Sequence, residues 1–103
     1  MVKVSVLYPN EDGKKFDMSY YLKTHIPLVR KLLGTACTDA AVDQGIAGGT
    51  PGSKAPYAVI GHLFFNSIED FITSFTPNAS AITGDIPNYT DITPVIQINE
   101  VKV

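Results

Sequence analysis

The chain has one cysteine and no tryptophan among its 103 residues. The lone Cys37 excludes an internal disulfide bond and any metal site built from several cysteines. Eight basic side chains nearly balance ten acidic ones, so charge gives no reason to expect nucleic acid or a membrane surface as a partner. Long apolar runs are also missing, and residues 1–8 alternate in polarity, unlike a signal peptide. We therefore expect one domain, residues 1–103, in the cytoplasm.

Four segments have the pattern of β-strands and two have the pattern of helices. The strands are expected near residues 2–8, 36–47, 57–66 and 94–103, and the helices at 16–34 and 67–75. The apolar phase of the last strand changes after Ile98, which predicts a bulge or a twist near residues 99–100. The order strand, helix, strand, strand, helix, strand predicts an α+β, ferredoxin-like βαββαβ fold. In this fold an antiparallel four-stranded sheet carries both helices on one face.

The strand at 57–66 is apolar on both of its faces. One face contains Tyr57, Val59, Gly61, Leu63 and Phe65, and the other contains Ala58, Ile60, His62 and Phe64. Two helices cover only one face of such a sheet, so the second apolar face needs another cover. We expect that cover to be a second copy of the chain, which makes the protein a homodimer.

The helix at 16–34 carries the histidine of greatest interest. With 3.6 residues per turn, an apolar arc faces the core and contains Met18, Leu22, His25, Ile26, Val29 and Leu33. Tyr21 lies one turn before His25, at the edge of this arc, whereas Tyr20 points away from it and is the weaker candidate. Pro27 lacks an N–H group and should bend the helix.

His25 allows two interpretations. An imidazole beside a phenol at the rim of a core is suited to acid–base chemistry, because histidine changes charge near neutral pH. The alternative is a buried histidine with a purely structural hydrogen bond. A metal site that joins His25 and His62 to Asp85 or Asp91 has no motif spacing, so we predict no metal, and His62 is typical of a core or interface histidine.

Several sequence segments together resemble one known family. They are Tyr8-Pro9, FDMSYYLKTHIPLV, the glycine-rich loop, YAVIGHLFFNSIEDF and DIPNYTD, and they cover nearly the whole chain. The most specific is the YY-x-x-x-H-x-P-L pattern at residues 20–28. This combination resembles the EthD family, whose members are similar to the dimeric α+β barrel proteins. That resemblance implies two ferredoxin-like sheets packed face to face, in agreement with the two-sided strand at 57–66.

The resemblance also implies a class of function. The family is named after an ether-degradation gene cluster and is usually described as oxidoreductase-like, and related barrels include cofactor-free monooxygenases, lactone isomerases and polyketide cyclases. By position, His25, Tyr21 and Tyr8 match the family's recurrent polar residues. We expect His25 and Tyr21 to be catalytic, in a pocket between sheet and helices with substrate contacts from Tyr8, His62, Phe64 and Tyr89, and no cofactor.

Two classes of function stay open at this point. The first is a small-molecule catabolic enzyme, of the oxidoreductase type or a cofactor-free isomerase or cyclase, that acts on a small apolar or aromatic compound. The second is a non-catalytic binding or accessory protein with the same pocket. A likeness in fold does not decide between them.

Overall fold

The chain is built on a four-stranded antiparallel sheet in this computed structural model, which describes residues 1–103. The strands are β1 (Val2–Pro9), β2 (Cys37–Gln44), β3 (Tyr57–Phe65) and β4 (Val95–Glu100). Their order across the sheet is β2-β3-β1-β4, so β1 and β3 occupy the centre. The strand that is apolar on both of its faces, β3, is thus a central strand.

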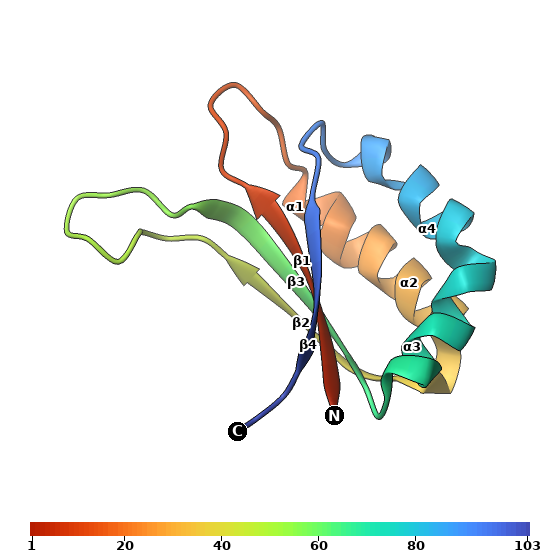
Figure 1. Cartoon of the computed structure of the whole chain (residues 1–103). Helices are drawn as coiled ribbons and strands as arrows, with labels where there is room; N and C mark the ends of the chain where they lie inside the picture. Colours follow the sequence, from red (N-terminus) through yellow and green to blue (C-terminus); the bar gives the residue numbers. More distant parts are fainter.

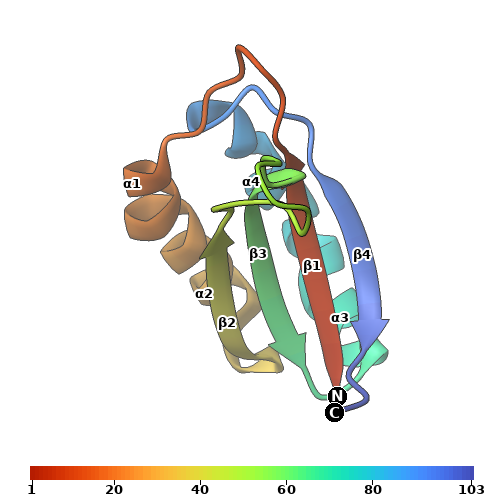
Figure 2. The same ribbon diagram turned by 90° about the vertical axis from the view of Figure 1, so that its left-hand side faces the viewer.

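Two helical segments cover one face of the sheet (Figure 1). The first contains α1 (Met18–Tyr20) and α2 (Ile26–Leu33), joined by a π-helical turn (Tyr21–His25). The second contains α3 (Ile68–Phe75) and α4 (Ala79–Gly84), joined by a 3-10 turn. Figure 2 shows the helices behind and beside the strands. None of them has the length and apolar content needed to cross a membrane. The predicted ferredoxin-like arrangement is confirmed.

The helix ends follow from local side-chain chemistry. The Asp17 carboxylate accepts a hydrogen bond from the amide of Tyr20, and the Ser67 hydroxyl accepts one from the amide of Asp70. Each of these bonds satisfies an amide that has no partner inside its helix. Gly34 ends α2 with φ at +63°, a backbone conformation that glycine adopts without a steric penalty.

The core lies between the sheet and the helices and has two parts. The larger part is mostly aliphatic and contains Val4, Val29, Leu33, Cys37, Leu63, Phe65, Phe71 and Ile82. The smaller part is mostly aromatic and contains Tyr8, Tyr21, Val59, Tyr89 and Ile92. Strand alternation explains the β1 and β3 members of both sets, because alternate residues of these strands project toward the helices.

The last strand is shorter and more regular than predicted. Its pairing with β1 runs without a register shift, and β4 ends at Glu100. Just beyond the strand, the amide of Val101 donates to the Met1 carbonyl at 2.9 Å. Of the predicted bulge or twist near residues 99–100, the bulge is wrong, because the change of apolar phase marks the end of the strand.

Candidate functional site

A π-helical turn positions His25. The amide of Ile26 donates to the carbonyl of Tyr21, five residues back, instead of to the carbonyl four residues back. Pro27 follows directly and has no N–H, and its ring would collide with the carbonyl of Lys23 in a regular α-helix. Widening the preceding turn relieves this collision, so the expected distortion at Pro27 takes the form of a π turn.

The π turn aligns Tyr21 with His25. A π turn has more than four residues, so side chains four positions apart lie nearly above one another. The two rings stack, with centroids 5.6 Å apart and planes 15° apart. Tyr21 is 2% exposed and His25 is 5% exposed, whereas Leu22 is 48% exposed. The prediction that Leu22 faces the core is wrong, because it assumed 3.6 residues per turn throughout.

Asp85 holds the imidazole of His25 in one orientation. Its Oδ2 lies 2.8 Å from Nδ1 of His25. Its Oδ1 accepts hydrogen bonds from the Tyr20 hydroxyl at 2.7 Å and from the Asn88 side-chain amide at 2.9 Å. A carboxylate with three such partners has little freedom to turn. It places the imidazole hydrogen on Nδ1 and leaves the lone pair on Nε2.

The same hydrogen bonds keep Asp85 ionised. Burial acts to raise the pKa of its carboxyl group, but hydrogen bonds from Tyr20, Asn88 and His25 together outweigh burial and lower this pKa below its ordinary value. At neutral pH the carboxylate is therefore negatively charged and stabilises a positive charge on His25. A base held by a third group in this way is a recurring feature of acid–base and nucleophilic sites.

Two tyrosine hydroxyls continue the hydrogen bonding on the other side of the imidazole. The Tyr89 hydroxyl lies 3.4 Å from Nε2 of His25, a long contact, and 2.6 Å from the Tyr8 hydroxyl, a short one. Burial raises the pKa of Tyr8 and of Tyr89 well above the ordinary value. Both hydroxyls therefore keep their hydrogens at neutral pH, and a hydrogen-bonded row runs from Asp85 to Tyr8.

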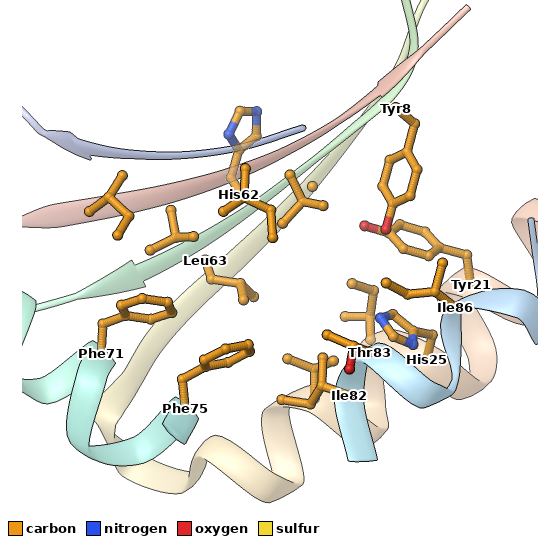
Figure 3. Close-up of a pocket in the computed structure, with 17 residues that line it drawn as sticks. Tyr8, Tyr21, His25, His62, Leu63, Phe71, Phe75, Ile82, Thr83 and Ile86 are labelled. Carbon is orange, nitrogen blue, oxygen red and sulfur yellow. The ribbon is translucent and has the colours of Figure 1, made fainter. Parts of the chain in front are cut away.

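A cavity of about 240 Å³ lies beside this row, between the sheet and the helices (Figure 3). Of its 17 lining residues 13 are hydrophobic, and none is a lysine or an arginine. Tyr8, Tyr21 and His25 lie at one end of the cavity, and Phe71 and Phe75 lie at the other. A small ligand with an apolar body and one polar group fits this distribution.

Four of the predicted site residues line the cavity: His25, Tyr21, Tyr8 and His62. Tyr89 lies behind them. It contacts His25 and Tyr8 through its hydroxyl but is not part of the wall. Tyr89 therefore supports the site through its hydroxyl and does not line this cavity.

Of the predicted ligand contacts on β3, His62 borders the cavity and Phe64 does not. Both residues alternate on β3 with Gly61, Leu63 and Phe65, which face the core, so their side chains project from the opposite face of the sheet. Figure 3 shows the imidazole of His62 on the far side of the strands from Tyr21 and His25. Neither side chain meets His25.

His62 instead belongs to a row of polar side chains across the outer face of the sheet. Its Nε2 lies 2.9 Å from Oδ2 of Asp43 on β2, and its Nδ1 lies 3.1 Å from the Ser5 hydroxyl on β1. Asn99 on β4 donates to the same hydroxyl at 3.2 Å. The sheet thus separates His62 from His25, and no group of three or more histidine, cysteine, aspartate or glutamate side chains is arranged to hold a metal.

Sequence reasoning missed three residues of the site. Tyr20, predicted to point away from the core, reaches Asp85 through its hydroxyl. Asn88 follows Asp85 by three residues across a 3-10 turn, and this aspartate–asparagine spacing was the available signal. Gly61 leaves room for the Tyr21 hydroxyl, because an added Cβ would overlap that oxygen. A glycine within an apolar strand is a known sign of such a close approach.

The fold and the cavity together define a ferredoxin-like α+β protein with a histidine-bearing pocket between its sheet and its helices. The EthD domain profile matches residues 12–93, and the chain belongs to the EthD family. A search of curated proteins found no match.

Solved structures agree with this assignment. An EthD-like protein from Ralstonia eutropha JMP134 is 40% identical over 99% of this chain and 92% of its own, with a TM-score of 0.94. An EthD family protein from Bacillus halodurans C-125 is 22% identical over 99% of both chains, with a TM-score of 0.74. HapK from Hahella chejuensis is 10% identical over 99% of this chain and 93% of its own, with a TM-score of 0.61. The last two similarities show the fold alone.

Proposed function

We propose that the protein is a small-molecule catabolic enzyme that binds an apolar or aromatic compound in the cavity and transfers a proton through His25. One observation carries the proposal. His25 lines the cavity while Asp85 holds its Nδ1 at 2.8 Å. A neutral imidazole oriented in this way offers Nε2 as a base, and the ionised Asp85 stabilises the imidazolium that forms.

The other residues of the site have supporting roles in this proposal. Tyr21 and Tyr8 line the cavity and contact the bound compound. Asp85 is a positioning residue, because it acts through His25. Tyr20 and Asn88 in turn fix the Asp85 carboxylate.

The type of reaction follows from what these side chains supply. A base, its carboxylate and neighbouring hydroxyls are sufficient for an isomerisation or cyclisation by proton transfer. The oxidoreductase-type chemistry expected from the family resemblance would add an electron acceptor to the same site. We therefore propose proton transfer as the step that this chain itself performs.

The second candidate is a binding protein without turnover, and one observation favours it. Both imidazole nitrogens of His25 have partners within the chain, Asp85 at 2.8 Å and Tyr89 at 3.4 Å. A histidine bonded on both sides is also typical of a structural role. The length of the Tyr89 contact favours the enzyme, because a strongly held Nε2 would not be free to accept a proton.

The homodimer and the cytoplasmic location remain part of the proposal. The outer face of the sheet has no helix over it (Figure 1), and Ile60 and Phe64 project from it, as does Leu7 of β1. Apolar side chains on a sheet face are stabilised by a second layer. Another copy of the chain, packed sheet to sheet, would supply that layer.

A screen with small phenols, lactones and ethers tests the function. Product formation and saturable binding are measured side by side as a function of pH. An enzyme gives turnover that His25→Gln removes and His62→Gln keeps, because His62 lies on the other face of the sheet. Saturable binding without product would support the binding protein and overturn the enzyme.

A further inference from the structure

The two ends of the cavity differ in chemistry. Phe71 and Phe75 lie at one end, and the hydroxyls of Tyr8 and Tyr21 lie beside His25 at the other (Figure 3). No lysine or arginine lines the wall, so a permanently charged carboxylate or phosphate would lose its water without gaining a counter-charge. A ligand that is neutral when it enters suits this cavity better.

The Tyr21 hydroxyl is available to a ligand. The residue is 2% exposed and lines the cavity, and its oxygen lies close to Gly61, with Tyr8 as its hydrogen-bonding neighbour. Burial, followed by the neighbouring Tyr8, raises the pKa of Tyr21 well above its ordinary value. The hydroxyl therefore keeps its hydrogen at physiological pH and can donate it to the oxygen of a ligand.

The Tyr8 hydroxyl adds a second donor. It lines the cavity and lies 2.6 Å from the Tyr89 hydroxyl. When Tyr89 donates in this pair, the hydrogen of Tyr8 is free to point toward a ligand. Two neutral donors that converge on one place form the arrangement that stabilises an oxygen gaining negative charge during a reaction.

We propose that the Tyr8 and Tyr21 hydroxyls together bind the oxygen of a compact, neutral carbonyl compound whose neighbouring carbon gives its proton to His25. The inference rests on the proposed function and names the substrate class, a cyclic ketone, an unsaturated ketone or a lactone. The apolar part of the bound substrate lies toward Phe71 and Phe75. Gly61 is part of this oxygen-binding site, because the absence of a side chain at Gly61 leaves the space that the Tyr21 hydroxyl occupies.

The chemical step balances without an oxidant. The C–H bond next to the carbonyl breaks, and its proton moves to Nε2 of His25. The electron pair of that bond forms a carbon–carbon double bond, while the carbonyl π pair moves to the oxygen. The resulting enolate oxygen accepts hydrogen bonds from Tyr8 and Tyr21. Return of the proton to the same carbon or to a conjugated one completes an exchange or an isomerisation.

The test compares 1-tetralone, a bicyclic ketone, with tetralin, the same ring system without the oxygen. Dissociation constants for both probes are measured by NMR titration in the wild-type protein, in Tyr8→Phe and Tyr21→Phe, and in the control Tyr57→Phe. Tyr57 lies on β3 but does not line the cavity. The ratio of the two dissociation constants reports the contribution of the carbonyl oxygen alone, because a general loss of packing or folding weakens the binding of both probes alike.

We expect each cavity tyrosine variant to weaken tetralone relative to tetralin by about tenfold, the effect of one hydrogen bond to a buried donor. Tyr57→Phe should leave the ratio unchanged. An unchanged ratio in either cavity variant would overturn the two-donor site. That failure is distinguishable from failure of the proposed function, which depends on loss of turnover in His25→Gln.

Discussion

Oδ2 of Asp85 lies 2.8 Å from Nδ1 of His25, although 60 positions separate the two residues in the chain. The contact joins the π turn of the first helical segment to the residue that follows α4. His25 lies in a helical turn that Pro27 distorts. The carboxylate of Asp85 is fixed by hydrogen bonds from Tyr20 and Asn88. Two separately constrained groups therefore meet at the edge of one cavity, as a preorganised acid–base site requires.

Replacing the carboxylate tests this pair. Asp85→Asn keeps the size of the side chain but removes the charge that orients His25 and stabilises its protonated form. We expect turnover to fall by about 10²-fold or more, with a shifted pH profile and nearly unchanged ligand affinity. Asp43→Asn is the matched control, because it removes the equivalent partner of His62 on the other sheet face. Equal losses in both variants would contradict a special role for Asp85.

The pKa of Asp85 makes stability depend on pH in a defined direction. This pKa is lower in the folded chain than the ordinary value of 3.8. Such a group stabilises the fold at pH values above its unfolded pKa, and the contribution is lost as the pH falls through the folded pKa. The difference in unfolding free energy between wild type and Asp85→Asn should therefore shrink between about pH 7 and pH 3. Urea unfolding measures it, and a constant difference would refute the assignment.

Gly61→Ala should crowd the Tyr21 hydroxyl. The added Cβ overlaps that oxygen, and Tyr21 cannot move away easily because its ring packs against Tyr8, Phe16 and Tyr89. We expect a loss of about 1–3 kcal/mol in the free energy of unfolding, measured by denaturant titration, as is typical of overpacking.

A second change and a control separate this crowding from a general effect of alanine. Tyr21→Phe removes the oxygen, so Gly61→Ala should cost much less in that background than in the wild type. Gly49→Ala adds a Cβ that meets no other atom and should change stability by about 0.5 kcal/mol or less. Equal costs of Gly61→Ala with and without the Tyr21 hydroxyl would show that the contact is not the cause.

If the protein is a dimer through the outer face of its sheet, a charged substitution on that face should lower the mass of the assembly in solution. A standard stable interface buries about 1,600 Å² in total, and Phe64 would lie within it. Phe64→Asp should give a monomer or insoluble protein, whereas Leu22→Asp, an exposed apolar position on the helical layer, should leave the dimer intact. Sedimentation velocity distinguishes these outcomes. A wild-type monomer at high micromolar concentration would rule out the dimer.

The fold was predictable because its signals are local. The elements are specified by a few neighbouring residues each: the alternation of β1, the apolar run of β3, the caps at Asp17 and Ser67, and the glycine exit at Gly34. The order of the elements then leaves the ferredoxin-like arrangement as the simple solution.

The site was less predictable because its decisive contacts are not local. The position of His25 on the core side followed from helical periodicity, but its pairing with Asp85 depends on how two distant segments cross. The prediction assumed a regular α-helix, but residues 21–25 form a π turn. In this turn Leu22 is exposed and the ring of Tyr21 stacks on that of His25. The outward direction of the His62 side chain was missed for another reason: residues 57–65 are apolar on both faces, which gives no local sign of which face borders the pocket.

Hydrogen exchange with solvent tests the central claim most directly. The wild-type protein and His25→Gln are incubated with 1-tetralone and a panel of lactones in D₂O, and NMR follows deuterium entry at the carbon beside the carbonyl. If His25 is the base, the wild type should catalyse this exchange, and His25→Gln should slow it by about 10²–10⁴-fold while the folded variant still binds the compound. Equal exchange rates in the two proteins, or tight binding by the wild type with no exchange, would contradict proton transfer at His25.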